Sequence, residues 1–160
     1  MNKMFGIFKK KKVETEVLSP VNGEVIKIDE VSDPVFNQKM MGEGFAVKPS
    51  NGEISSPISG VVKSIFPTKH ALTIEGTNDL NLLIHVGLDT VALKGEGFNV
   101  RVAEGQKINE GDALLSVDLE VLKNNGKDNA VIVAFPEQAD LQLSVNEGVV
   151  TNKTVAATIK

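Results

Sequence analysis

Short apolar runs separated by turn-forming residues are the feature of this sequence that most restricts its fold. The runs are rich in Val, Ile and Leu, and 14 glycines and 6 prolines are spread over 160 residues. Such runs bounded by turn signals are typical of strands, whereas a helical bundle needs longer periodic segments. We therefore expect an all-β fold, an antiparallel β-sandwich with one or two short helical turns.

The expected strands cover residues 24–28, 44–49, 61–66, 71–75, 81–86, 113–118, 130–135 and 155–159. One short helix is expected over residues 119–124, with Asp118 as its N-cap and Gly126 after its end. A Ser-Pro-x-x-Gly-x-Val element occurs at 19–25 and again at 56–62, and Val-x-Glu-Gly occurs at 102–105 and 145–148. Two copies of a turn that enters a strand predict a pseudo-symmetric sandwich.

Charge separates the first residues from the rest of the chain. Residues 1–12 hold five lysines and no acid, and the remaining residues hold 12 basic and 21 acidic side chains. We expect residues 1–15 to form a basic tail, amphipathic or disordered, and residues 16–160 to form one domain. In a helical tail, Met1, Met4, Phe5 and Phe8 make an apolar stripe beside the lysines, which suits peripheral contact between residues 1–12 and an anionic membrane.

Several protein classes are excluded by composition. The absence of cysteine rules out a disulfide scaffold, a thiolate zinc site and a cysteine nucleophile. No apolar run approaches the roughly 18 residues of a membrane span, and we see no secretion signal, so a cytoplasmic protein is expected. A basic tail on a body of net charge −9 is not the pattern of a nucleic-acid binder, which spreads Lys and Arg over a folded face, so we expect no nucleic-acid partner.

The two histidines, His70 and His85, are the only histidines in the chain. If residues 76–79 form a four-residue turn, Glu75 faces Leu80, and His70 lies directly opposite His85 on the same face of a hairpin. A neutral imidazole has one bare nitrogen that can attack a phosphoryl group. A second imidazole can donate a hydrogen bond to the oxygens of the transferred phosphoryl group. A two-histidine metal site is the alternative, but catalytic zinc needs a third protein ligand, and we expect no metal site.

Longer segments around both histidines resemble a known family. Segment 66–71 (FPTKHA) and segment 82–98 (LLIHVGLDTVALKGEGF) resemble the two histidine motifs of the glucose-type IIA component of the bacterial phosphoenolpyruvate-dependent sugar phosphotransferase system. Segments 33–44, 56–60 and 104–112 resemble further family segments, so the resemblance covers about residues 17–160. It implies an antiparallel β-sandwich with a shallow, apolar active-site depression.

The resemblance also implies a mechanism. The phosphocarrier HPr, charged by Enzyme I from phosphoenolpyruvate, passes a phosphoryl group to Nε2 of His85, which passes it to a cysteine on the IIB domain of a sugar permease. His70 stabilises the phosphoryl group, and Thr68 orients His70. On an extended strand Thr68 and His70 share a face, since they are two residues apart. No cofactor is implied, and the chain has no Gly-x-x-x-x-Gly-Lys-Ser/Thr sequence for ATP.

A partner-binding rim follows from the same resemblance. Its apolar members are Val35, Phe36, Met40, Met41, Phe66, Leu83 and Val91, and the acids Asp33 and Asp89 border it. Periodicity alone makes Leu83 a core residue, whereas Phe36 next to two methionines is typical of an adaptable binding surface.

Three other functions compete with the phosphocarrier. A stand-alone IIA protein can act mainly by binding regulatory target proteins according to its phosphorylation state. Lipoyl and biotinyl carriers present Met-Lys-Met or Asp-Lys-Ala, but residues 39–41 read Lys-Met-Met. Zinc peptidases of related architecture use His-x-His, which this chain lacks.

Overall fold

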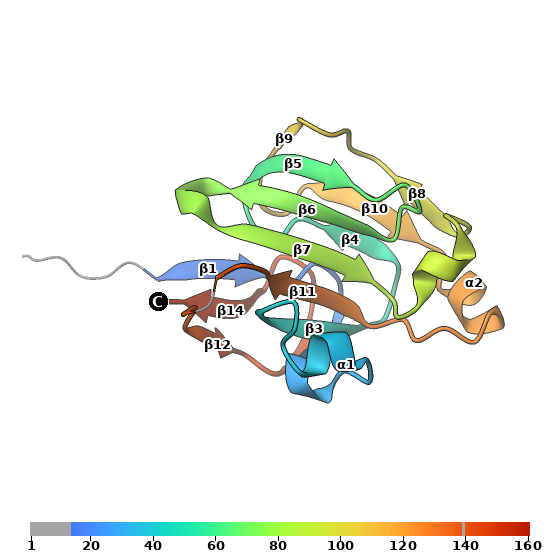
Figure 1. The fold of residues 1–160 in the computed structure, drawn as a ribbon, viewed down its shortest axis with the longest axis horizontal. Helices are drawn as coiled ribbons and strands as arrows, with labels where there is room; N and C mark the ends of the chain where they lie inside the picture. Colours follow the sequence, from blue (N-terminus) through green and yellow to red (C-terminus); the bar gives the residue numbers. More distant parts are fainter. Residues whose placement is uncertain (1–13, 139) are drawn as a thin grey trace, which may run out of the picture.

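Three antiparallel sheets make up the fold, in a computed structural model that describes residues 14–138 and 140–160 (Figure 1). The strands are β1 (Thr15–Leu18), β2 (Gly23–Lys27), β3 (Glu43–Pro49), β4 (Glu53–Ser55), β5 (Gly60–Ile65), β6 (Ala71–Gly76), β7 (Asn81–Val86), β8 (Phe98–Val100), β9 (Lys107–Ile108), β10 (Ala113–Val117), β11 (Val131–Phe135), β12 (Leu143–Val145), β13 (Gly148–Val150) and β14 (Val155–Ile159). The large sheet has the order β13-β2-β3-β11-β7-β6-β5-β9, and the two small sheets are β1-β14-β12 and β4-β10-β8. The predicted all-β antiparallel architecture is confirmed. The expected tail lies mostly outside the described residues, and β1 begins at Thr15.

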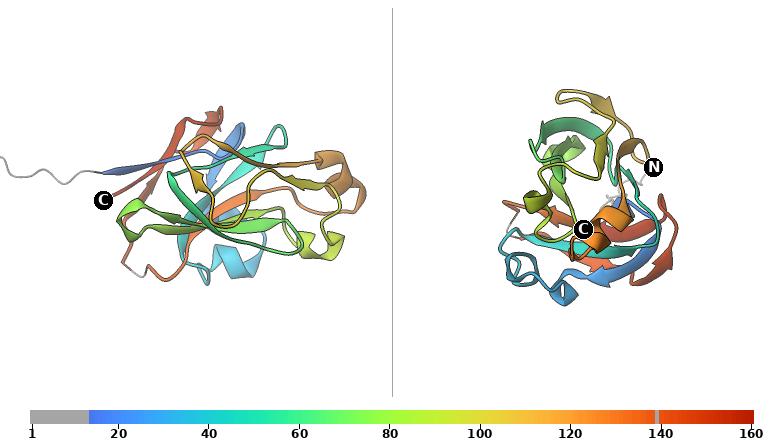
Figure 2. Two further views of the ribbon diagram at one scale, coloured as in Figure 1. Left: turned by 90° about the horizontal axis from the view of Figure 1, so that it is seen from above. Right: turned by 90° about the vertical axis from the view of Figure 1, so that its right-hand side faces the viewer.

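Two short α-helices accompany the sheets, α1 (Pro34–Asn37) and α2 (Leu119–Asn124). Helix α2 has the predicted bounds, and the Asp118 carboxylate caps it by accepting a hydrogen bond from Glu120 N. The two views of Figure 2, together with Figure 1, place α2 at one end of the molecule, while β1 begins and β14 ends at the other. Neither helix is long and apolar enough to cross a membrane within the described part of the chain.

Helix α1 was not among the expected elements, although its start carries a clear signal. The Asp33 carboxylate accepts a hydrogen bond from Val35 N at 2.9 Å, and Pro34 occupies the first helical position. Proline is favoured there because its missing N–H has no intrahelical partner in any case. The Asp-Pro pair therefore marks the start of this one-turn helix, but four residues are too few to show a helical period.

The large sheet is apolar on both faces. On the inner face, side chains such as Leu72, Ile84 and Val133 join residues of both small sheets in one buried core. A second cluster lies on the outer face, and its members are Ile26, Ile28, Val31, Phe36, Ala46, Ala71, Leu83, Leu88, Ile132 and Ala134. This outer cluster provides an apolar floor on the face that carries His85.

The repeated Ser-Pro elements form two equivalent turns. In each turn a buried serine hydroxyl donates to a carbonyl two residues later, from Ser19 to Val21 at 2.7 Å and from Ser56 to Ile58 at 2.6 Å. Each hydroxyl satisfies a carbonyl that would otherwise be buried without a partner. The predicted repeat therefore corresponds to a repeated local structure.

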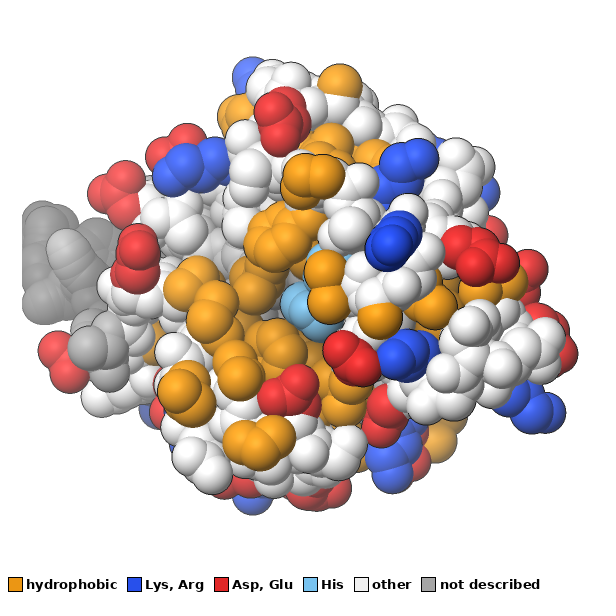
Figure 3. Space-filling model, turned by 45° about the vertical axis from the view of Figure 1, so that its right-hand side comes forward, with side chains coloured by type: hydrophobic (Ala, Val, Ile, Leu, Met, Phe, Trp, Pro, Cys, Tyr) orange, Lys and Arg blue, Asp and Glu red, His pale blue; other side chains and the backbone are white. Residues whose placement is uncertain are grey.

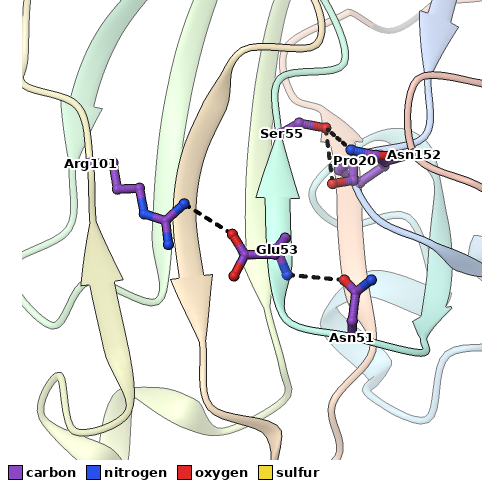
Figure 4. A network of polar contacts seen from close by, with 6 residues as sticks. All are labelled: Pro20, Asn51, Glu53, Ser55, Arg101 and Asn152. Carbon is purple, nitrogen blue, oxygen red and sulfur yellow. Dashed lines mark hydrogen bonds and ion pairs between the residues drawn. The ribbon is translucent and has the colours of Figure 1, made fainter.

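The two turns also bind each other. Leu18 N donates to Pro57 O at 3.0 Å, and Ser55 N donates to Pro20 O at 2.7 Å. The Ser55 hydroxyl contacts Pro20 O as well, and the Asn152 side chain reaches this hydroxyl at 3.4 Å (Figure 4). In each case the backbone N–H just before one repeat donates to the proline carbonyl of the other, so each turn completes the hydrogen bonds of its partner.

The β6–β7 hairpin differs from the expected one by a single residue. Glu75 pairs with Asn81 and not with Leu80, because residues 76–80 make the connection through a 3₁₀ turn at Thr77–Asp79. Gly76 N donates to Leu80 O at 2.7 Å and closes this loop. Leu80 is buried in the inner core, so burial of its side chain favours the longer loop over the predicted four-residue turn.

Candidate histidine site

The two histidines lie side by side, but not through the predicted strand pairing. His85 on β7 pairs with Ala71, so the expected direct pairing of His70 with His85 is wrong by one residue. His70 precedes β6 and follows Lys69, whose φ is 65°, so strand alternation does not set its direction. Val86 N donates to the His70 carbonyl at 2.7 Å, and the two ring centroids are 4.8 Å apart at an interplanar angle of 80°.

Thr68 lies in the turn between β5 and β6, not on a strand as expected. Lys69 N donates to Phe66 O within this turn, and the turn brings Thr68 Oγ1 to 2.8 Å from Nδ1 of His70. A hydroxyl can donate to a bare Nδ1, which leaves the proton of His70 on Nε2. The Phe66 ring meets the His70 ring edge to face at 5.6 Å and restricts it from another side.

The ring of His85 is held with its proton on Nδ1. Its Nδ1 lies 2.8 Å from the carbonyl oxygen of Gly87, and a carbonyl can only accept. The proton of His85 therefore sits on Nδ1, and Nε2 keeps a free lone pair. Gly87 has a φ of 78°, and a Cβ there would lie 2.5 Å from Thr90 Cγ2 and 2.9 Å from Asp128 O. Glycine is required for this backbone geometry, which turns the carbonyl back toward the ring.

Burial keeps both rings neutral near pH 7. Desolvation is the main cause that lowers the pKa of His85 to about 4, and the charge of a protonated His70 lowers it further. The Gly87 carbonyl and the Asp33 carboxylate raise the pKa of His85 and offset part of this effect. Burial likewise lowers the pKa of His70, against an opposing contribution from the backbone of Thr68.

An apolar surface surrounds the histidines. Figure 3 shows histidine side chains at the bottom of a hollow that is bordered by hydrophobic side chains. Four residues of the predicted rim, Val35, Met40, Phe66 and Val91, are between 37 and 68% exposed. Exposed apolar side chains gathered in one place are typical of a surface that binds another macromolecule.

The other apolar residues of the predicted rim are less accessible. Met41 is half-buried, while Phe36 and Leu83 are buried in the outer cluster of the large sheet. The ring of Phe36 lies 5.0 Å from the ring of His85. Phe36 and Leu83 therefore form the floor of the hollow and support His85 from below.

The two acids of the predicted rim, Asp33 and Asp89, lie at the border of the hollow. Asp33 caps α1, and Asp89 is exposed, with its carboxylate 2.8 Å from Nζ of Lys127. The hydrogen bond and charge of Lys127 lower the pKa of Asp89. Lys127 was not found from the sequence, and neither was the role of the Gly87 carbonyl. The Lys127 contact joins residues 38 positions apart, so no local pattern reveals it.

The arrangement can perform nucleophilic chemistry on an open surface. One ring presents a bare nitrogen, and the neighbouring ring carries a proton that it can donate to a transferred anionic group. Within residues 14–138 and 140–160, no three His, Asp or Glu side chains gather closely enough to hold a metal ion. Fold and site together define a β-sandwich protein with a reactive imidazole on an open apolar face, a class suited to passing a group between macromolecules.

Comparison with known proteins identifies the family. Residues 15–141 match the model of the phosphoenolpyruvate-dependent sugar phosphotransferase system, EIIA 1. The chain is 47% identical over 139 residues to the glucose-specific EIIA component of Staphylococcus aureus, which covers 86% of this chain and 84% of the relative. It is 51% identical over 125 residues to the glucose-specific EIICBA component of Streptococcus pneumoniae, covering 78% of this chain and 17% of that protein.

A solved structure has the same fold. The glucose permease IIA from Mycoplasma capricolum superposes with a TM-score of 0.84 at 38% identity, covering 93% of this chain and 97% of that one. The chain belongs to the EIIA 1 family of the phosphoenolpyruvate-dependent sugar phosphotransferase system. It is a phosphocarrier in sugar uptake, and membership of the family implies exchange with HPr and with a IIB domain.

Proposed function

We propose that Nε2 of His85 is the atom that carries the phosphoryl group. The bond between the phosphoryl group and HPr breaks as the Nε2 lone pair forms a bond to phosphorus. In the second step the Nε2–phosphorus bond breaks, and a cysteine thiolate of the IIB domain takes the group. His70 donates a hydrogen bond to the phosphoryl oxygens, and Thr68 orients His70.

One observation carries this assignment. The Gly87 carbonyl holds the proton of His85 on Nδ1, so Nε2 is the bare nitrogen of that ring. His70 has its Nδ1 beside a hydroxyl that can donate to it, so its remaining proton is free to face the phosphoryl group. Opposite tautomers in neighbouring rings give one nucleophile and one donor.

A phosphorelay assay with Enzyme I, HPr, phosphoenolpyruvate and a IIB domain tests the two roles. His85→Gln should take up no phosphate, because no attacking nitrogen remains. His70→Gln should still take up phosphate, but its onward transfer to IIB should slow by on the order of 10²–10³, as for the loss of one transition-state donor. Labelled phosphate on His85→Gln but not on His70→Gln would reverse the assignment.

Thr68→Val tests the orienting role in the same assay. The substitution keeps the shape of the side chain and removes the hydroxyl beside Nδ1 of His70. We expect slower phosphoryl transfer with little change in the free energy of unfolding, since Thr68 is only half-buried. Rates equal to wild type for both steps would show that Phe66 and the backbone orient His70 without Thr68.

The exposed apolar residues Val35, Met40, Phe66 and Val91 are proposed to contact both HPr and the IIB domain. Phosphoryl transfer requires each partner to reach His85, and these side chains border the hollow around it. Met40 is flexible enough to adapt to two partners in turn. Regulatory target proteins would dock on the same face, and the comparisons favour the transport role over a purely regulatory one.

The partner permease is proposed to be of the glucose type. Relatives at 46 to 51% identity, in staphylococci and in Streptococcus pneumoniae, are named glucose-specific. The EIIA protein does not select the sugar directly, so recognition of the IIB domain must carry this specificity. Transfer rates from the phosphorylated protein to IIB domains of different permeases test it, with the fastest transfer expected for a glucose-type domain.

We also propose that the protein works in the cytoplasm, with residues 1–12 touching the inner face of the membrane. Support comes from the sequence alone, namely five lysines beside an apolar stripe. Such contact would keep the phosphocarrier close to its permease.

A further inference from the structure

Thr90 is a buried polar residue close in sequence to His85. Its side chain is fully buried at the first position of the 3₁₀ helix Thr90–Leu93. The hydroxyl donates to the carbonyl of Val86 at 2.7 Å. Its methyl group lies against Gly87, since a Cβ built on that glycine would be 2.5 Å from Thr90 Cγ2. Thr90 therefore contacts the segment between His85 and the carbonyl that binds it.

Two successive peptide groups in this segment are fixed by hydrogen bonds. In the Val86–Gly87 peptide, Thr90 holds the carbonyl, and Gly87 N donates to Ala130 O at 2.8 Å. In the next peptide, Leu88 N donates to the backbone carbonyl of Asp128 at 2.9 Å, and the Gly87 carbonyl accepts the Nδ1 proton of His85. The two peptide groups share the Cα atom of Gly87, so the orientation of the first restricts that of the second. The Thr90 hydrogen bond therefore helps to orient the Gly87 carbonyl toward the ring of His85.

We propose that Thr90 is a positioning residue that keeps His85 in the Nδ1–H tautomer with Nε2 bare. This inference rests on the proposed function, in which Nε2 of His85 is the nucleophile. Thr90 touches neither the ring nor the phosphoryl group, and it acts through the Val86–Gly87 peptide. Val86 N also donates to His70 O at 2.7 Å, so the same residue of β7 is tied to both histidines.

A purely structural role for Thr90 predicts something different. A buried hydroxyl that satisfies a strand-end carbonyl stabilises the fold wherever it occurs. Ser56 provides the matched control, because its buried hydroxyl donates to Ile58 O at 2.6 Å in a turn that contacts neither histidine ring. Loss of either hydroxyl should destabilise the protein, but only the loss of the Thr90 hydroxyl should alter the tautomer of His85.

The experiment compares Thr90→Val, Thr90→Ser and Ser56→Ala with the wild-type chain. The ¹⁵N chemical shifts of the His85 ring report its tautomer, and uptake of phosphate from phospho-HPr reports the rate. We expect Thr90→Val to show a mixture of tautomers and roughly 3- to 10-fold slower uptake, in line with the loss of one hydrogen bond. Thr90→Ser keeps the donor and should restore both, and Ser56→Ala should match wild type in both.

The outcomes separate the two hypotheses. A wild-type tautomer and rate in Thr90→Val would show that Thr90 is structural only. If wild-type His85 takes up no phosphate, the proposed function fails, while the ¹⁵N shifts still test the positioning role by themselves. If Thr90→Val does not fold, Thr90→Ala, which has no hydroxyl to donate, takes its place, and an unchanged tautomer there overturns the proposal.

Discussion

The environment of His85 gives this side chain an unusual proton affinity. Burial beside a second imidazole disfavours the charged ring, and this lowers its pKa to about 4. With a pKa of about 4, the ring of His85 is almost entirely neutral near pH 7. A histidine with an ordinary pKa would be partly protonated, and thus partly inactive, near pH 6.5.

Stability should depend on pH through this residue. The unfolded chain protonates His85 near pH 6.5 and the folded chain only near pH 4, so the unfolded state binds more protons between these values. The contribution of His85 to stability is thus present above pH 6.5 and is lost as the pH falls toward 4. The loss is at most about 3 kcal/mol, because each pKa unit corresponds to about 1.4 kcal/mol and part of the ring meets solvent.

Denaturant unfolding at pH 7 and pH 4.5 measures this effect. Carboxylates and His70 also titrate in this range, so the wild type is compared with His85→Gln, which keeps the same carboxylates and His70 and lacks only the ring at position 85. We expect the free energy of unfolding to fall further in the wild type than in the variant. Equal losses in both proteins would mean that the ring of His85 titrates alike in the folded and unfolded chains.

At the level of elements, helix α1 connects the exposed apolar rim to the ring of His85. The Asp33 carboxylate caps its first turn, Val35 on the helix is exposed, and Phe36 packs beside the ring of His85. The negative charge of Asp33 also raises the pKa of His85. One turn of helix therefore combines a surface contact, a packing contact and an electrostatic one.

Substitutions at Asp33 separate the cap from the charge. Asparagine is as good an N-cap as aspartate, so Asp33→Asn should keep the stability of the protein while lowering the pKa of His85 further. Asp33→Ala removes both and should also cost about 1 kcal/mol of stability. NMR titration of His85 and thermal unfolding measure the two effects, and equal stabilities for the two variants would show that the cap contributes nothing.

Long strands could be predicted from the sequence, whereas short strands could not. The eight expected strands occur within one residue of their predicted bounds, because apolar runs of five or more residues between turn-forming residues leave a clear pattern. The other six strands were not predicted: β1 has four residues, and β4, β8, β9, β12 and β13 have two or three each. Nothing local distinguishes such short strands, which exist only through pairing with a neighbour.

Prediction of the site shows the same limit. The two histidines were expected together, and they are together, but the reasoning used a hairpin that Leu80 shifts by one residue. The backbone turn at Lys69 compensates for that shift. Contacts that depend on distant parts of the chain, such as Lys127 with Asp89, were not predicted because no spacing encodes them.

At the scale of the whole molecule, charge is distributed unevenly. Residues 13–160 carry 12 basic and 21 acidic side chains, so this part of the chain is repelled by an anionic membrane. The five lysines of residues 1–12 are attracted to it, by about 1 kcal/mol for each lysine near the surface. Residues 1–12 are therefore expected to act as a weak, salt-sensitive tether.

Vesicle flotation tests the tether. The full chain should bind anionic vesicles at low salt, and a variant without residues 1–12 should not. Replacement of Lys9, Lys10, Lys11 and Lys12 by Gln keeps the apolar stripe and should also abolish binding. Equal, negligible binding by the full chain and the shortened variant would end the proposal.

Strand β1 pairs with β14, so Thr15 lies opposite Ile159. During synthesis, the hydrogen bonds between β1 and β14 can therefore form only after β14 has left the ribosome. The crossed hydrogen bonds between the two Ser-Pro turns likewise join residues far apart in the sequence, since neither repeat is complete without the other. Long-range pairing of this kind makes folding slow and leaves partly made chains with unpaired strands. Nascent chains of this protein are accordingly expected to leave the edge of β1 unpaired until β14 has been made.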